Sequence, residues 1–145
     1  MTRRVQLAFA LAGTALLAGC GGGDDAPEAT TEVSITGTDE LAFDPDAFVV
    51  PVGEEVSLDL IAESTVEHDL VIEGAAGTVM MGDEGHDDEA MEMEEEDVPI
   101  AHADAGESVS ATFTVEEAGE YVLFCSVPGH RSAGMEATLT VVDDA

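Results

Sequence analysis

Three side chains that bind soft metal ions recur at equal spacing near the C-terminus of the chain. Cys125, His130 and Met135 are separated by four residues each in the segment CSVPGHRSAGM. Thiolate and thioether groups select copper, and one thiolate with two imidazoles and a weak axial methionine is the ligand set of an electron-transfer copper site. This segment therefore supplies three of the four ligands, and a second histidine must come from elsewhere.

His68 is the best candidate for the second histidine. It stands at the start of the apolar run HDLVI, which predicts a β-strand. The other two histidines are less suitable, because His86 lies in a strongly acidic segment and His102 has no soft ligand nearby, so we expect His102 on the surface. Each of the four chosen side chains also has a structural alternative: a buried inert thiol, a surface or strand imidazole, or a methionine packed in the core. The spacing within the segment favours metal binding.

The sequence on either side of the segment predicts how these residues are positioned. Apolar residues alternate with others before Cys125 and again after Met135, which predicts two β-strands. Pro128, Gly129 and Gly134 interrupt any strand between them. We therefore expect a loop that brings Cys125, His130 and Met135 together at one end of a sheet.

This loop resembles the copper loop of the cupredoxins, a family with sulfocyanin-like, auracyanin-like and plastocyanin-like members, and its spacing is most similar to that of the sulfocyanin-like and auracyanin-like ones. The segments Glu67–Ile72 and Gly53–Val56 also resemble the family pattern, so the resemblance covers residues 33–143 apart from one insert. It implies a Greek-key β-sandwich with a single type 1 copper ion at one end, between loops. The implied ligands are His68, Cys125, His130 and Met135, with no further cofactor.

The remaining patterns agree with an all-β fold. Residues 33–143 contain seven or eight short runs of alternating apolar residues, separated by turn residues, and no convincing helical stripe. At 145 residues the chain has room for one domain with a real core. Strands of this number and spacing predict a β-sandwich.

The first twenty residues read as an export signal. A basic start, a short apolar run and small residues predict a signal peptide over residues 1–19. Leu17–Cys20 resembles a lipobox, which implies that Cys20 is acylated, and the acidic residues 20–32 predict a flexible tether. The alternative is a plain secretory signal that ends in cysteine. Arg3 and Arg4 also resemble a twin-arginine export signal.

Residues 80–97 do not fit the strand pattern. They hold ten acidic residues, four methionines and His86. This composition predicts a solvated loop or a short frayed helix inserted between strands. Because thioethers bind Cu(I) and imidazole binds Cu(II), a second hypothesis is that the insert captures copper.

The charge of the chain excludes one class of partner. There are 33 acidic residues, three arginines and no lysine, and removal of residues 1–19 takes away two arginines and no acid, which gives 1 − 33 = −32. Nucleic-acid binding needs a basic surface, so we exclude it. This acidic composition resembles that of halophilic proteins, in which salt screens the repulsion between the acidic side chains. The alternative is an ordinary acidic secreted protein.

These patterns together predict a monomeric, lipid-anchored, extracytoplasmic blue-copper electron carrier that is not an enzyme. We expect its partners to be redox proteins or membrane respiratory or photosynthetic complexes, which dock on the small apolar residues around His130 beside Arg131. The alternative is a copper chaperone or storage lipoprotein that the insert helps to load. One departure from the family pattern is Asp69, where members often have Asn or Ser, and a carboxyl group there would alter hydrogen bonding to the thiolate.

Overall fold

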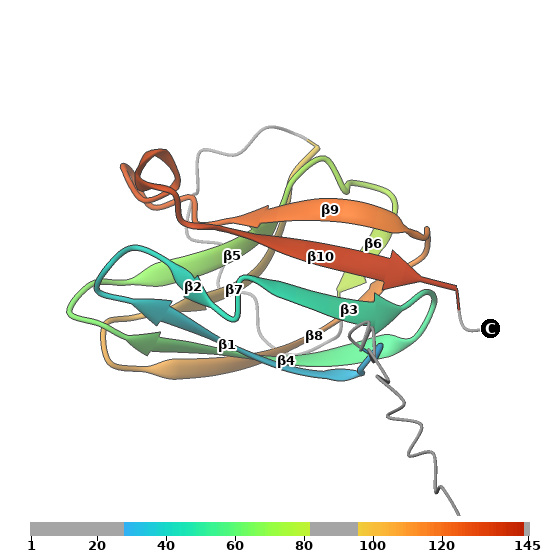
Figure 1. Ribbon diagram of the computed structural model, residues 1–145, viewed down its shortest axis with the longest axis horizontal. Coiled ribbons are helices and arrows are strands. Elements are labelled where there is room, and N and C mark those ends of the chain that lie inside the picture. The colour runs from blue at the N-terminus through green and yellow to red at the C-terminus, as the bar shows by residue number, and fades with distance from the viewer. Residues whose placement is uncertain (1–27, 82–95, 144–145) are drawn as a thin grey trace, which may run out of the picture.

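The computed structural model describes residues 28–81 and 96–143, which form two five-stranded sheets packed face to face (Figure 1). The first sheet has the order β2 (Phe43–Asp44), β1 (Glu32–Thr38), β4 (Glu55–Glu63), β8 (Ser108–Val115) and β6 (Val79–Met81). The second has the order β3 (Ala47–Pro51), β10 (Glu136–Val142), β9 (Gly119–Phe124), β5 (His68–Ile72) and β7 (Val98–Ala103). Every connection from β2 to β9 crosses between the sheets, which confirms the predicted all-β sandwich.

The period-2 pattern of the strands builds the core between the sheets. In β4, Val56, Leu58, Leu60 and Ala62 are buried, while the residues between them face outward. β8 pairs with β4 in antiparallel register and turns Ala111, Phe113 and Val115 to the same interior. Burial of these side chains supplies the main driving force for folding.

The described residues form ten strands, where the sequence predicted seven or eight. The additional strands β2 and β6 have two and three residues, which is too short for an alternating pattern to be visible. β6 contains Met80 and Met81, which the sequence assigned to the insert and which pair with Thr114 and Phe113 of β8. Residues 82–95 of the insert, which include His86, lie outside the described residues, so the structure does not test the hypothesis that the insert captures copper.

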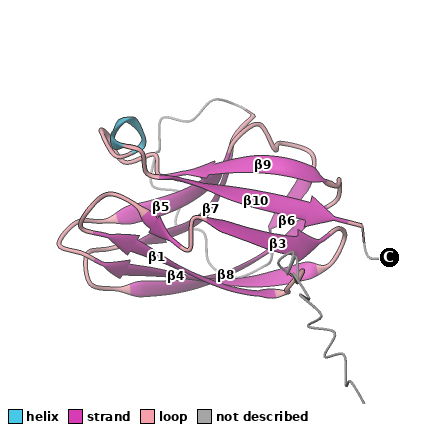
Figure 2. Cartoon of the chain, viewed as in Figure 1, coloured by secondary structure: helices cyan, strands magenta, loops and turns pink. Residues whose placement is uncertain are grey.

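The hairpin of β9 and β10 determines where the candidate site lies. Phe124 at the end of β9 pairs with Glu136 at the start of β10, so residues 125–135 project beyond one end of the sheet. A single 3₁₀ turn, η1 (Arg131–Ala133), lies within this loop (Figure 2). β5 pairs with β9 through Val71 and Phe124, which places the start of β5 at the same end. In the part of the chain that the structure describes, no helix has the length and apolar character needed to cross a membrane.

Candidate metal centre

The structure brings together three of the four predicted ligands. One ligand atom from each of His68, Cys125 and His130 lies within 4.8 Å of the others. The Sγ atom of Cys125 is 3.4 Å from Nδ1 of His130, and the two imidazole ring centroids are 5.2 Å apart. His68 and Cys125 are fully buried, and His130 is 8% exposed. A thiol and two imidazoles therefore meet at the end of the sandwich, sheltered from water.

Met135 belongs to the same loop and its side chain is fully buried. Its N–H donates to the carbonyl of His130, and its own carbonyl accepts from the N–H of Cys125, both at 3.2 Å. These backbone hydrogen bonds close the loop on itself. Gly129 and Gly134 have φ of 90° and 106°, a left-handed conformation that favours glycine and allows the chain to turn here. The predicted loop is thus held by its own backbone.

The surroundings of the His68 ring are the feature of the site that best fits a bound metal ion. Its Nε2 lies 2.7 Å from Ser64 Oγ, whereas its Nδ1 is buried with no hydrogen-bond partner. Buried polar atoms in native proteins are nearly always paired, so an orphaned ring nitrogen next to a thiol and a second imidazole is a site for a ligand. The donor set of nitrogen and sulfur atoms fits copper.

Gly37 of β1 lies against the His68 ring. A Cβ atom at this position would stand 2.5 Å from Cδ2 of His68 and 2.7 Å from Cγ, which is closer than real contacts allow. The absence of a side chain at Gly37 therefore makes room for the imidazole. Sequence reasoning missed this residue, because nothing in the local pattern links Gly37 to His68.

Burial determines the protonation of the metal-free site. It raises the pKa of the Cys125 thiol to about 12, and the charge of Asp69 acts in the same direction, while hydrogen bonds from backbone groups partly oppose it. Burial also lowers the pKa of His68, and neighbouring His130 contributes to the lowering. The thiol and this imidazole are therefore neutral near pH 7 without metal. A metal that binds as a thiolate complex must displace the thiol proton.

Asp69, the departure from the family pattern, ties β5 to the loop. Its side chain is buried, and its two oxygens accept hydrogen bonds from the N–H and the hydroxyl of Ser126, each at 2.5 Å. Ser126 directly follows Cys125, so these bonds position the thiol-bearing backbone. The sequence singled out Asp69, but its partner could not be inferred from local patterns.

Arg131 fixes the outer side of the loop. Its guanidinium donates to Glu73 at 2.7 Å and to Glu136 at 2.8 Å, and it stacks over the Phe124 ring at 4.1 Å. The hydrogen bond to Glu73 is the main reason that its pKa is raised. The charge that the sequence placed beside His130 is thus already paired with two carboxylates.

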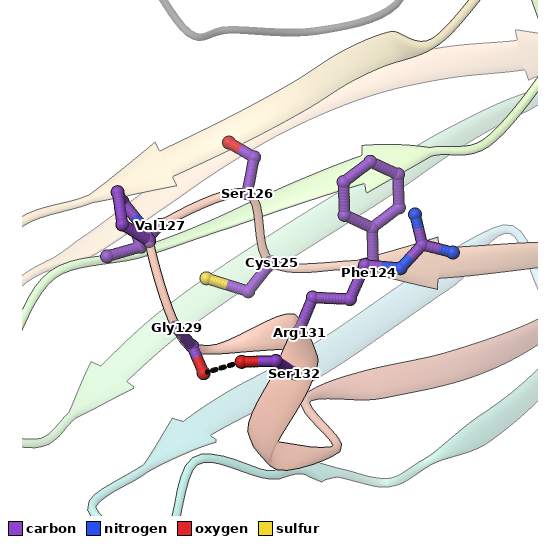
Figure 3. Close-up of a pocket in the computed structure, with 8 residues that line it drawn as sticks. Phe124, Cys125, Ser126, Val127, Gly129, Arg131 and Ser132 are labelled. Atoms are coloured by element: carbon purple, nitrogen blue, oxygen red, sulfur yellow. Dashed lines mark hydrogen bonds between the residues drawn. The ribbon is translucent and has the colours of Figure 1, made fainter.

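The outer face of the loop forms a shallow hollow (Figure 3). It is lined by Phe124, Cys125, Ser126, Val127, Pro128, Gly129, Arg131 and Ser132. The hydroxyl of Ser132 donates to the Gly129 carbonyl at 2.9 Å, which braces the turn (Figure 3). Of the small and apolar residues that the sequence placed around His130, Val127 and Pro128 line this hollow, whereas Ala133 and Gly134 do not.

His102 lies apart from these residues. Its side chain is 39% exposed, which confirms the expectation of a surface histidine. Its Nε2 is 3.7 Å from a Glu67 oxygen and 3.8 Å from an Asp104 oxygen. These three side chains, the exposed triad, form a second group of metal-ligand types among the described residues.

Comparison with known proteins places the chain in a family. The family model for copper binding proteins of the plastocyanin/azurin type matches residues 29–142. Auracyanin-B of Chloroflexus aurantiacus is 33% identical over 129 residues, covering 81% of this chain and 54% of the relative, so the chain spans about half the length of that protein. The copper-resistant cuproprotein CopI of Rubrivivax gelatinosus is 28% identical over 118 residues, covering 81% of this chain and 70% of the relative.

Solved structures give the same result for the fold. A crystal structure of auracyanin B superposes with a TM-score of 0.59 at 26% identity, covering 79% of this chain and 91% of that one. Auracyanin A, a blue copper protein of Chloroflexus aurantiacus, gives the same TM-score at 24% identity over 77% and 98% of the two chains, which supports the fold alone. The chain therefore belongs to the plastocyanin/azurin family of copper-binding proteins, and His68, Cys125, His130 and Met135 fit a single type 1 copper ion.

Proposed function

We propose that the protein is an extracytoplasmic one-electron carrier whose copper ion is bound by His68, Cys125, His130 and Met135. The observation that carries this proposal is the buried group of a thiol and two imidazoles, with the His68 Nδ1 left unpaired. Membership of a copper-binding family supports the same metal. The protein carries electrons and converts no substrate of its own.

The residues of this chain keep the site rigid. Copper, when bound, supplies the change of valence, and a thiolate with imidazoles suits both of its oxidation states. The burial of the ligand side chains excludes water, and the hydrogen bonds that Ser126 donates to Asp69 fix the Cys125 backbone. His130, with 8% exposure, is the ligand edge nearest to solvent. We infer that electrons enter and leave through this imidazole.

The proposed location follows from the start of the chain. A signal peptide over residues 1–19, acylation of Cys20 and a tether over residues 20–32 would hold the domain at the outer face of the cell membrane. Residues 1–27 lie outside the described part of the structure, so this element of the proposal comes from the sequence. Membrane respiratory or photosynthetic complexes and other redox proteins would then be within reach of a monomeric carrier.

A spectrum of the copper-loaded protein tests the proposal. The chain from residue 20 onward, with Cys20→Ser to prevent acylation, is mixed with Cu(II) beside the same chain with Cys125→Ser. An intense blue band that bleaches with a one-electron reductant, returns on oxidation and is missing in Cys125→Ser is expected. A first chain that binds copper without this band would overturn the proposal.

The relationship to CopI, named as a copper-resistant cuproprotein, favours copper handling as a second candidate function. Under this alternative the insert loads the site and the metal is exchanged with other molecules. A chain that lacks residues 82–95 discriminates between the two functions. A carrier without this segment takes up copper at the normal rate and keeps Cu(I) in the presence of a chelator. A copper-handling protein loads slowly and yields Cu(I).

A further inference from the structure

The two ring nitrogens of His68 have different surroundings. Nε2 lies 2.7 Å from the hydroxyl oxygen of Ser64, four residues earlier in the turn between β4 and β5. Nδ1 is buried and has no hydrogen-bond partner, and a ring nitrogen of His68 lies within 4.8 Å of the ligand atoms of Cys125 and His130. Which nitrogen carries the proton therefore decides whether the imidazole can bind a metal ion at Nδ1.

The hydrogen bonds of Ser64 determine where that proton lies. Ser64 has a single hydroxyl proton, and its Oγ is 2.7 Å from the carbonyl oxygen of Val66. A carbonyl oxygen can only accept, so the hydroxyl donates its proton to Val66. The Oγ atom is then free only to accept, and its short contact to His68 requires a proton on Nε2.

We propose that Ser64 is a positioning residue that holds His68 in the Nε2–H tautomer, with the Nδ1 lone pair directed into the site before any metal arrives. This inference rests on the proposed copper function, because in that function the Nδ1 lone pair binds the metal ion. Histidine ligands generally donate their second N–H to a partner that fixes the ring and raises its basicity. Here the partner is a side chain, so it can be changed by mutation.

Gly37 also limits the placement of the His68 ring. Because a Cβ atom there would overlap Cδ2 and Cγ of His68, the ring lies directly against the β1 backbone. Gly37 thus limits where the ring can lie, while Ser64 determines its protonated nitrogen. Loss of the hydroxyl leaves Nε2–H without its partner and allows the other tautomer, in which a hydrogen on Nδ1 blocks the metal.

A matched pair of variants isolates the hydroxyl. Ser64→Thr keeps it and Ser64→Val replaces it with a methyl group of the same shape. Thr65→Ala is the control in the same turn, because the hydrogen bonds of Thr65 in the structure go to Asp39 and not to His68. The tautomer of His68 is read in the metal-free protein by long-range ¹H–¹⁵N NMR. Affinity is measured by chelator competition with Zn²⁺, which has no redox chemistry and cannot oxidise the thiol.

The wild type, Ser64→Thr and Thr65→Ala are expected to show the Nε2–H tautomer and equal Zn²⁺ affinity. Ser64→Val is expected to lose the dominance of that tautomer and to bind Zn²⁺ about 10- to 100-fold more weakly, as found when such partners of metal ligands are removed. If Ser64→Val does not fold, Ser64→Ala takes its place with the same expectations. An unchanged tautomer and an unchanged affinity in the folded variant would overturn the proposal.

The two proposals fail in different ways. If the wild type lacks a blue copper band but keeps the Nε2–H tautomer, the electron-carrier proposal is overturned and the role of Ser64 in fixing the ring stands. If the wild type is blue and Ser64→Val matches it in tautomer and affinity, only the role of Ser64 is overturned.

Discussion

Two groups of metal-ligand side chains lie next to each other in this molecule, and only one of them has the features of a binding site. His68, Cys125 and His130 form the buried group, while Glu67, His102 and Asp104 form the exposed triad. The groups are neighbours in the fold, because Glu67 precedes His68 and His102 pairs with Asp69 across the β5–β7 ladder. In both groups the ligand atoms lie within 4.8 Å of one another.

The two groups differ in the surroundings of one histidine nitrogen in each. His102 Nε2 has two carboxylate oxygens at 3.7 and 3.8 Å, beyond hydrogen-bond distance, and its side chain is 39% exposed, so water can reach this nitrogen. His68 Nδ1 is buried without any partner. Exposed ion pairs contribute little and form readily on an acidic surface. An unsatisfied buried atom is costly, and this cost is a better guide to a binding site than the proximity of ligand types.

The same substitution in each group gives the largest expected contrast. His68→Ala removes a ligand and is expected to abolish the blue absorption band, whereas His102→Ala is expected to leave the band and the copper affinity unchanged. Visible spectra during Cu(II) titration of both variants measure this. Loss of the band in His102→Ala would show that the exposed triad contributes to the copper site.

A smaller effect is expected from filling the space beside His68. Gly37→Ala puts a Cβ atom 2.5 Å from the ring, so the ring or β1 must move, and overpacking of this kind costs about 1–3 kcal/mol of unfolding free energy. Gly119→Ala is the control, because its Cβ would meet only Tyr121 at an ordinary 3.6 Å. Denaturant unfolding and the position of the blue band measure the result. Equal stability of the two variants would contradict a tight fit at His68.

The buried thiol makes metal binding depend on pH. Since the pKa of Cys125 is raised to about 12, each bound metal ion releases one thiol proton at ordinary pH, and affinity should rise about tenfold per pH unit between pH 7 and 9. Zn²⁺ competition and proton release to an indicator measure this. The lowered pKa of His68 keeps that imidazole neutral in the same range, so it adds no further slope. A flat profile would mean that the thiol is already ionised.

The same shift has a consequence for the stability of the metal-free protein. The pKa of the thiol is higher in the folded protein than the ordinary value of 9.0, so the unfolded chain loses its proton first. The contribution of this thiol to the free energy of unfolding is therefore fully present below pH 9.0. It is lost as the pH rises from 9.0 toward 12, because the unfolded chain then gains stability by ionising. In Cys125→Ala this loss should be absent from denaturation curves recorded across the range.

The smallest expected effect concerns the charge next to the site. Asp69→Asn keeps a carbonyl for the Ser126 N–H and removes a buried negative charge. A carboxylate stabilises Cu(II), with its higher charge, more than Cu(I), so its loss should raise the reduction potential by an amount equivalent to on the order of 1 kcal/mol. Asp104→Asn, in the exposed triad, is screened by solvent and should change the potential less. Voltammetry of both variants tests this. Equal shifts would show that burial of Asp69 does not matter.

The sequence predicted the copper loop and the sandwich well, because both depend on local patterns. Cys125, His130 and Met135 lie on one loop, so their spacing alone brings them together, and His68 was recognisable at the start of an apolar strand. The short strand β6 was not predicted, since Met80 is exposed and is held by backbone pairing to β8 and not by core packing.

The residues that support the ligands could not be predicted. Gly37 reaches His68 from β1, which is parallel to β4 in the other sheet, and Ser126 meets Asp69 only when β5 and β9 lie side by side. These contacts depend on the packing of distant strands, and no spacing rule encodes them. Ser64 is close to His68 in the chain, but its role appears only when the turn directs its hydroxyl at Nε2.

The complete burial of Cys125 affects how readily its thiol is oxidised before a metal ion binds. Oxidants attack the thiolate, and susceptibility follows ionisation and exposure. Burial raises the pKa of the Cys125 thiol to about 12 and leaves it no exposed surface, so near pH 7 the thiolate is scarce and poorly accessible to peroxide and to other thiols. In the extracytoplasmic location proposed above, the protein can therefore keep its sulfur unoxidised before an ion arrives.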